Sequence, residues 1–169
     1  MMRRMSKKQQ LKDNEESVLK KSMYTGFIGG VLFSLLASAM YYFNFLEVTP
    51  KYYLLTSWVS AEWTDTWLGI LFTTILAGAV SLLIACLYYL ILKKIKYMWV
   101  GIIYGFILWV ILFILFHPIF NDIPAVMEWS MNTWVTTICL FILYGTFIGY
   151  SISYDYMDSK QTEDIIEKS

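Results

Sequence analysis

Five residues hold most of the chemical potential of this sequence, one imidazole and four carboxylates in the stretches between apolar segments: His117, Glu62, Asp65, Asp122 and Glu128. Carboxylates together with an imidazole can bind a divalent cation, and imidazole changes its charge near its usual pKa of about 6.5. The sequence has no HExxH motif and no second histidine. We therefore expect no metal and no cofactor. If the protein has a metal or pH-responsive site after all, these five residues are the candidates for it. The alternative is that His117 only ends a helix near water.

Long apolar segments must position these side chains. Of the 169 residues, 58% are hydrophobic and only 15% are charged, whereas soluble domains average about 25% charged residues. A helix needs roughly 20 apolar residues to cross a bilayer. The sequence therefore predicts an all-α polytopic membrane protein whose transmembrane domain, residues 23–154, is a compact antiparallel bundle of four transmembrane helices. The expected spans are residues 23–46, 67–92, 99–119 and 134–154.

Two polar tails flank this domain. Residues 1–22 are basic and residues 155–169 are acidic, and we expect most of both tails to be irregular and mobile. The small-x-small pattern of Ala37-Ser38-Ala39 resembles a signal-peptide cleavage site. However, the apolar run continues to Leu46 and reaches spanning length, which favours its retention as the first span.

The distribution of Lys and Arg predicts the orientation. Seven lie before the first span, one in the first loop, three between the second and third spans, none before the fourth span and two after it. Basic residues concentrate on the cytoplasmic side, and acidic residues contribute little to this rule. We therefore expect a multi-pass cell-membrane protein with both termini in the cytoplasm.

Small residues recur at a spacing of four within the apolar segments. Such residues let helix backbones approach closely in lipid, where there is little hydrophobic drive for helix association. This pattern favours a tight bundle over separate helices, although any of these faces could instead serve self-association. The helix-packing residues that we predict are Gly26, Gly30, Ser34, Gly69, Ala77, Gly101, Gly105, Gly145 and Gly149.

Tryptophans gather near the loops of the expected outer side, and their usual role is an interfacial aromatic belt. They are Trp58, Trp63, Trp67, Trp129 and Trp134. A ligand-stacking role is the alternative.

Two stretches of the sequence resemble each other. Both Glu62–Trp67 and Glu128–Trp134 read Glu-Trp, a short polar stretch, then Thr-Trp. Either a duplication with a twofold axis along the membrane normal or chance explains this likeness. In the first loop, residues 47–66, Thr49-Pro50 is typical of a helix start, with an irregular loop as the alternative.

The four expected spans contain no Asp, Glu, Lys or Arg. Ion-coupled carriers usually place such residues within the membrane, and intramembrane enzymes need polar catalytic groups. We therefore expect a non-enzymatic protein, in contact with the lipid bilayer, that binds a membrane protein or lipid partner or associates with itself. A small channel or facilitator is the alternative, and an envelope sensor of pH or metal is a third. The formal net charge is zero, so nucleic acid is not an expected partner.

The segment Ile138–Tyr156, together with Phe116-His117-Pro118 and the following Asp122 and Pro124, resembles the YqhR-type conserved membrane proteins of bacilli. This resemblance covers most of residues 20–157. More loosely, the second half is similar to the YagU-type bacterial inner-membrane proteins. The YqhR resemblance implies a four-span plasma-membrane protein of a spore-forming Gram-positive bacterium, and it implies no assigned chemistry.

Overall fold

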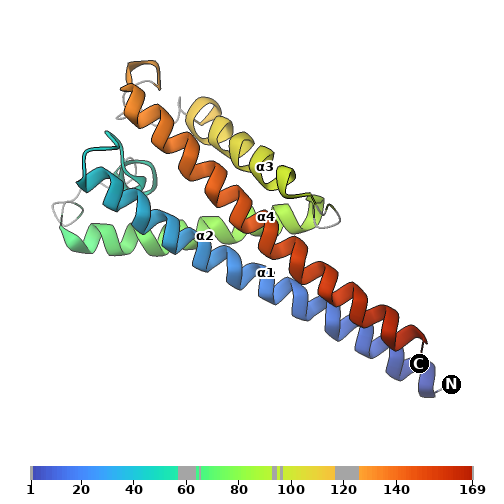
Figure 1. Ribbon diagram of the computed structural model, residues 1–169. Helices are drawn as coiled ribbons and strands as arrows, with labels where there is room; N and C mark the ends of the chain where they lie inside the picture. The colour runs from blue at the N-terminus through green and yellow to red at the C-terminus, as the bar shows by residue number, and fades with distance from the viewer. Residues whose placement is uncertain are drawn as a thin grey trace.

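The computed structural model describes residues 2–56, 64, 66–92, 95, 97–116 and 126–168, and all the regular structure within these ranges is helical. Four α-helices form the bundle in Figure 1, joined by three short helical turns. The α-helices are α1 (Met2–Tyr42), α2 (Trp67–Leu92), α3 (Met98–Val110) and α4 (Met131–Lys168). The short turns are η1 (Tyr52–Thr56), η3 (Ile111–Leu115) and η5 (Val126–Glu128).

Helices α1 and α2 pack as one antiparallel pair and α3 and α4 as a second, and α4 also packs on α1 and α2. The two termini lie together at one end of the bundle (Figure 1), which we call the terminal end. The loop after α1 and the start of α4 lie at the opposite end, which we call the distal end. This all-helical bundle confirms the predicted fold class.

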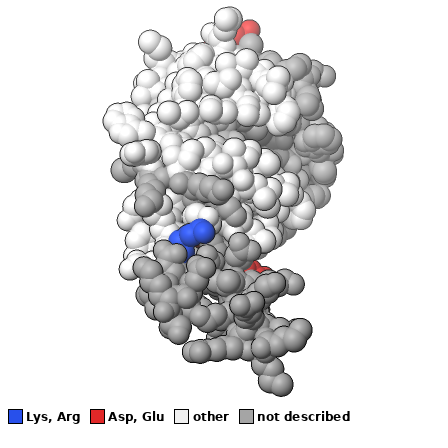
Figure 2. Space-filling view, turned by 90° about the vertical axis from the view of Figure 1, so that its right-hand side faces the viewer, with Lys and Arg blue, Asp and Glu red and all other residues white. Residues whose placement is uncertain are grey.

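Three helical segments are long and apolar enough to cross a bilayer: Glu16–Tyr42, Trp67–Leu92 and Met131–Thr162. A shorter apolar segment, Trp99–Leu115, consists of α3 and η3. Seen from the side on which the termini lie, the described surface is almost free of charged side chains (Figure 2). Such a surface suits contact with acyl chains, because a charged side chain in the bilayer centre costs several kcal/mol.

The helical ends differ from the sequence expectation. Both tails expected to be irregular are helical, since α1 begins at Met2 and α4 continues to Lys168. Residues 1–22 are rich in the good helix formers Lys, Arg, Gln, Glu, Leu and Met, and neither tail contains Gly or Pro. Glu16 and Lys20 add an ion pair one turn apart in α1, at 2.8 Å.

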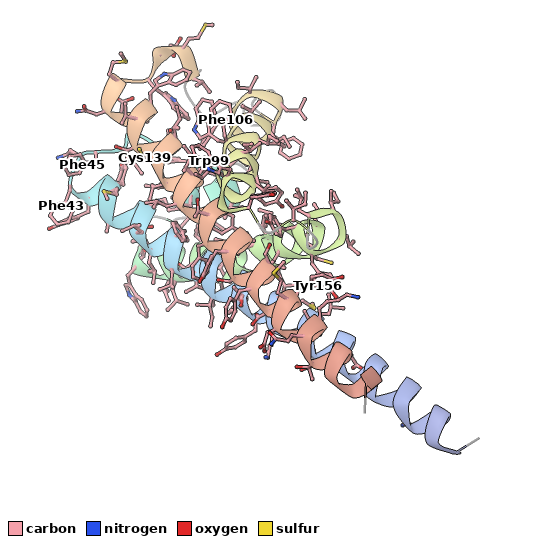
Figure 3. The ribbon with its side chains drawn as sticks, turned by 45° about the vertical axis from the view of Figure 1, so that its right-hand side comes forward. Phe43, Phe45, Trp99, Phe106, Cys139 and Tyr156 are labelled. Carbon is pink, nitrogen blue, oxygen red and sulfur yellow. The ribbon has the colours of Figure 1, made fainter. Side chains whose placement is uncertain are left out.

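Helix α1 ends at Tyr42, four residues before the expected end of the first span. Asn44 has a positive φ of 61°, and its N–H donates to the Tyr41 carbonyl at 2.9 Å. The Phe45 N–H donates to the Met40 carbonyl, also at 2.9 Å. These two bonds form a Schellman motif, in which asparagine replaces the usual glycine because it tolerates the left-handed conformation. The chain therefore turns sharply here, and Phe43 and Phe45 lie at the distal edge (Figure 3).

The first loop contains one helical turn after Thr49-Pro50, the π-helical η1. The Tyr52 N–H donates to the Thr49 carbonyl at 3.0 Å, so the turn begins where a helix start was one of the two readings. Leu55 in this turn is 2% exposed. The turn is therefore part of the packed protein, and Trp58 lies outside the described residues.

The packing lacks the twofold symmetry that a duplication predicts. If α1 corresponded to α3 and α2 to α4, a twofold axis would make the contact between α2 and α3 as large as the contact between α1 and α4. Instead, α1 packs closely on α4, whereas α3 packs chiefly on α4 and little on α2. Three of the six residues of the first Glu-Trp motif, Glu62, Trp63 and Asp65, lie outside the described residues. Trp67 is 67% exposed, whereas its counterpart Trp134 packs inward.

Candidate functional site: the distal aromatic cluster and the buried hydroxyls

A distal aromatic cluster joins α3, η3 and the start of α4. Trp109, Phe113 and Trp129 are its buried rings, and Trp134 packs against them. The Phe113 and Trp129 rings meet edge to face at 5.0 Å between centroids, and the Trp109 and Trp134 rings are 5.2 Å apart. Such pairs add about 0.5–1.5 kcal/mol beyond the burial of their surface.

The π-helical turn η3 directs Phe113 into this cluster. The Phe116 N–H donates to the Ile111 carbonyl at 3.0 Å, a bond that spans five residues instead of four. A π-turn of this kind rotates the following side chains relative to an α-helix and is often found at functional sites. The turn therefore marks the distal end of the third span as a place where packing departs from a regular helix.

The indole N–H groups of Trp109 and Trp134 are bonded within the protein. Trp109 Nε1 donates to Thr137 Oγ1 at 3.1 Å, and Trp134 Nε1 donates to the Val126 carbonyl at 2.8 Å. Thr137 in turn donates to the Thr133 carbonyl at 2.8 Å. These bonds favour a structural role for the cluster over the stacking of a ligand. Of the five tryptophans expected in a belt, Trp129 is instead 6% exposed.

Glu47 connects the first loop to the N-terminus of α4. Its carboxylate accepts a hydrogen bond from the Ser130 N–H at 3.2 Å, and its own N–H donates to Thr133 Oγ1 at 3.2 Å. The first N–H groups of a helix lack partners within the helix and carry partial positive charge, so a carboxylate stabilises them. Val48 follows Glu47 directly and is buried in the distal aromatic cluster. Glu47 therefore holds the loop over the cluster.

We expect Glu47→Gln to lower the free energy of unfolding by about 1 kcal/mol, because the amide keeps the shape but removes the charge that favours the helix N-terminus. Unfolding of the purified protein by SDS in mixed micelles measures this change. Glu128→Gln is the matched control, since Glu128 is an exposed acid in the neighbouring turn η5, and its effect should stay within about 0.5 kcal/mol. Equal losses from both variants would contradict the role of Glu47.

Glycines bring α1 and α2 into backbone contact. A Cβ atom at Gly30 would lie 2.7 Å from the Ala77 carbonyl oxygen and 2.9 Å from Gly78 Cα, and one at Gly26 would meet Ala85 and Ser81. Any side chain larger than hydrogen at these two positions would push the helices apart. Gly69 is different, because its nearest neighbour is the Thr64 backbone before α2 begins. Gly78, which lies outside the predicted spacing, contacts Phe27 and Val31 of α1.

A second glycine contact joins α3 and α4. A Cβ atom at Gly145 would lie 2.5 Å from the Gly101 carbonyl oxygen and closer still to the Gly105 backbone. One at Gly149 would lie 2.9 Å from Gly101 Cα and 3.0 Å from the hydroxyl of Tyr88 on α2. The four predicted glycines of these two helices thus meet in one contact, with Tyr88 at its edge.

Buried hydroxyl groups connect the helices in the middle of the bundle. Ser81 Oγ donates to the Gly26 carbonyl at 2.5 Å and lies 2.5 Å from Tyr144 Oη, which joins α1, α2 and α4. The Tyr104 hydroxyl of α3 donates to the Ile84 carbonyl of α2 at 2.8 Å. Hydrogen bonds between transmembrane helices contribute on average about 0.6 kcal/mol. These groups therefore fix the relative positions of the helices more than they add stability.

The network continues toward the terminal end. Tyr88 Oη and Ser153 Oγ are 3.4 Å apart, and Ser153 Oγ donates to the Ile95 carbonyl between α2 and α3 at 3.1 Å. The rings of Tyr88 and Tyr104 meet edge to face at 4.9 Å. Tyr88 is 1% exposed. Tyr88, Tyr104 and Tyr144 were not among the residues predicted from the sequence, although tyrosines within apolar spans are a usable signal for such bonds.

The five candidates for a metal or pH-responsive site are not brought together by the described part of the chain. Glu62, Asp65, His117 and Asp122 lie outside the described residues, and Glu128 is exposed at the end of η5. Within the ranges that the structure describes, no three His, Cys, Asp or Glu side chains gather in a way that could hold a metal ion. The candidate site therefore stays a prediction from the sequence.

Comparison with known proteins identifies the family. A family model described as conserved membrane protein YqhR matches residues 3–167, which is nearly the whole chain. The chain belongs to the YqhR family. It is also 47% identical over 132 residues to a Bacillus subtilis (strain 168) protein described as "Uncharacterized protein YqhR", covering 78% of this chain and 74% of that protein. No solved structure matches the chain.

Membership of the YqhR family confirms the resemblance seen in the sequence and establishes a membrane protein. It leaves the activity open. The family match covers both helical tails as well as the four apolar segments. The tails are therefore part of what relates this chain to the YqhR family.

Proposed function

We propose that this protein is a multi-pass protein of the cell membrane with both termini in the cytoplasm. Ten of the 13 basic residues lie before the first span or between the second and third spans. Both of those regions must face the same side in a four-span protein. The position of the two termini at one end of the bundle is consistent with this orientation (Figure 1). Reporter fusions test the proposal.

A fluorescent protein that folds only in the cytoplasm should be bright when fused to either terminus. Alkaline phosphatase, which folds only outside the cytoplasm, should be active when fused after Met127 and inactive when fused after Lys168. The opposite phosphatase pattern would overturn the proposed orientation.

We further propose that the protein acts without catalysis by binding another membrane protein, a lipid or a second copy of itself. The observation that carries this proposal is the closed contact between helices. Gly30 meets the α2 backbone and Gly145 meets the α3 backbone, while Ser81 bonds to α1 and α4. Helices in such close contact leave little room for a substrate path, so the outer faces are the natural place for recognition.

In-cell crosslinking followed by affinity purification in mild detergent tests partner binding. Another four-span protein, expressed from the same promoter with the same tag, is the control for nonspecific capture. We expect one reproducible crosslinked membrane protein, lipid species or dimer that the control does not yield. Recovery of the protein alone, as a monomer in lipid nanodiscs, would overturn the proposal.

A small channel or facilitator is the second candidate function, and one observation favours it. Ser34 Oγ in α1 and Thr73 Oγ1 in α2 are buried and have no hydrogen-bond partner among the described residues. Buried hydroxyls of this kind often bind water. If they belong to a water path, reconstituted protein should show solute or ion flux that the Ser34→Ala, Thr73→Ala variant lacks. The absence of flux in the wild-type protein would remove this candidate.

A further inference from the structure

The tails of α1 and α4 lie side by side beyond the apolar core. Figures 1 and 3 show the two helices adjacent in both views up to the terminal end. The contact has a buried seam, since Val18 of α1 is 4% exposed and packs in one cluster with Ile152 and Tyr156 of α4. Ser22 and Ser159, on the same two helices, are 0% and 8% exposed. This pairing is a packed contact between the tails.

The register of the pair follows from one contact in the apolar core. A Cβ atom at Gly29 would touch the side chains of Phe147 and Ile148. In an antiparallel pair the α1 numbers fall as the α4 numbers rise. Eleven residues toward the terminal end, Val18 is therefore level with Ser159, which agrees with the burial of both.

This register places opposite charges at the same levels. Among the side chains that the structure describes, α1 is acidic at Glu16 and basic at Lys20 and Lys21. The charged residues of α4 within about one turn of these levels are Lys160, Asp158 and Asp155. Lys20 and Lys21 therefore lie near the level of Asp155 and Asp158, and Glu16 lies near the level of Lys160.

The balance of charge over the whole tails has the same complementarity. Residues 1–22 contain seven basic and three acidic residues, and residues 155–169 contain five acidic and two basic residues. A basic cluster that directly adjoins a transmembrane helix binds anionic phospholipid headgroups, and each Lys or Arg near the surface adds to the attraction. An acidic helix packed beside that cluster competes with the lipid for the same charges.

We propose that the acidic end of α4 masks the basic end of α1, so that the pair is an autoinhibitory contact against binding of the α1 end to anionic phospholipid. The headgroups are the ligand within reach, because Lys20 and Lys21 directly precede the apolar segment of α1. Lys20 and Lys21 are exposed to solvent, so the masking is electrostatic, and release of the α4 end removes the neighbouring acidic charge and lets the basic helix attach to an anionic lipid surface. This contact is independent of the partner proposed above.

Vesicle binding tests the masking. The full-length protein in phosphatidylcholine nanodiscs is mixed with vesicles of phosphatidylcholine, with or without phosphatidylglycerol, and co-sedimentation is measured. A masked wild-type protein should bind the anionic vesicles weakly. A variant with the five acidic residues of the α4 end changed to amides should bind about tenfold or more tightly, because each unmasked basic residue adds to the attraction of the anionic surface. The changes are Asp155→Asn, Asp158→Asn, Glu163→Gln, Asp164→Asn and Glu167→Gln.

Two further variants make the result specific. Lys160→Gln, Lys168→Gln changes the same helix but leaves it acidic, and it should not increase binding. Adding Lys12→Gln, Lys20→Gln and Lys21→Gln to the amide variant should lower its binding again. The proposal is overturned if the amide variant binds no more tightly than the wild type, or if the wild type already binds as tightly as that variant.

Disulfide formation tests the pairing itself. In a background in which Cys86 and Cys139 are replaced by alanine, Val18→Cys, Ser159→Cys should form a disulfide on mild oxidation, because the two positions share one level and a bridge needs Cα atoms within about 7 Å. Ser17→Cys, Thr162→Cys is the matched pair, since both of those side chains are exposed. Equal bridging by the two pairs, or none by the first, would contradict the antiparallel register.

Discussion

Trp109→Ala is expected to lower the free energy of unfolding by about 3–5 kcal/mol, the range typical of removing a large buried aromatic side chain. Trp109 is 2% exposed, and its ring contacts those of Trp134 and Phe113. Loss of the indole opens a cavity between α3 and α4, and it removes the bond to Thr137. SDS titration in mixed micelles or steric trapping in a bilayer measures the change.

Two variants separate packing from the hydrogen bond. Trp109→Phe keeps an aromatic ring but loses the N–H donor, so it should cost less than Trp109→Ala. Trp99→Ala changes a tryptophan of the same helix that is 72% exposed, and it should cost less than about 1 kcal/mol. A result in which Trp99→Ala matched Trp109→Ala would show that the distal aromatic cluster does not stabilise the bundle.

Gly145→Leu is expected to separate α3 from α4 and to lower the free energy of unfolding by about 3 kcal/mol or more, the upper end for overpacking. The new side chain would begin against the backbone of Gly105 and the carbonyl of Gly101. These obstacles are main-chain atoms of the opposite helix and cannot turn away as a side chain would. Gly145→Ala should cost less, because a single methyl group displaces the opposite backbone less than a leucine side chain does.

Cys139→Leu is the matched control for Gly145→Leu. Cys139 lies on the same helix and is exposed, so leucine there can extend into lipid. We expect a change within about 0.5 kcal/mol. If both variants unfolded at the same SDS fraction, the glycine contact between α3 and α4 would not be the feature that holds these helices together.

The sequence predicts the class of fold well because the bilayer imposes a simple rule. A segment must be apolar over its whole length to remain in hydrocarbon, so the length of each apolar run is nearly sufficient evidence. The spacing of glycines is a second local signal, and Gly26, Gly30, Gly101, Gly105 and Gly145 all lie where two helices meet. The spacing of the glycines alone could not show which helix each glycine face packs against.

Other features depend on contacts between residues far apart in the chain. Glu47 contacts Ser130, 83 residues away in the sequence, and Thr133, 86 residues away. No short sequence pattern around Glu47 indicates either partner. The pairing of the α1 and α4 tails is of the same kind, because each tail alone has the composition of a mobile segment. By contrast, the end of α1 at Tyr42 has a local cause in Asn44, since asparagine is the usual substitute for glycine in a Schellman motif.

The closed core of the bundle favours binding at the outer faces over transport through the bundle. Its most direct test is the reaction of a cysteine at position 81 with a charged, water-soluble thiol reagent, in a background with Cys86→Ala and Cys139→Ala. Ser81 is 3% exposed and lies in the hydroxyl network between α1, α2 and α4. Ser130→Cys, at the exposed distal end, serves as the reactive reference, and an unchanged SDS midpoint verifies that Ser81→Cys is folded. We predict that Ser81→Cys stays unlabelled in intact membranes while Ser130→Cys is labelled, whereas comparable labelling of the two would contradict a closed core.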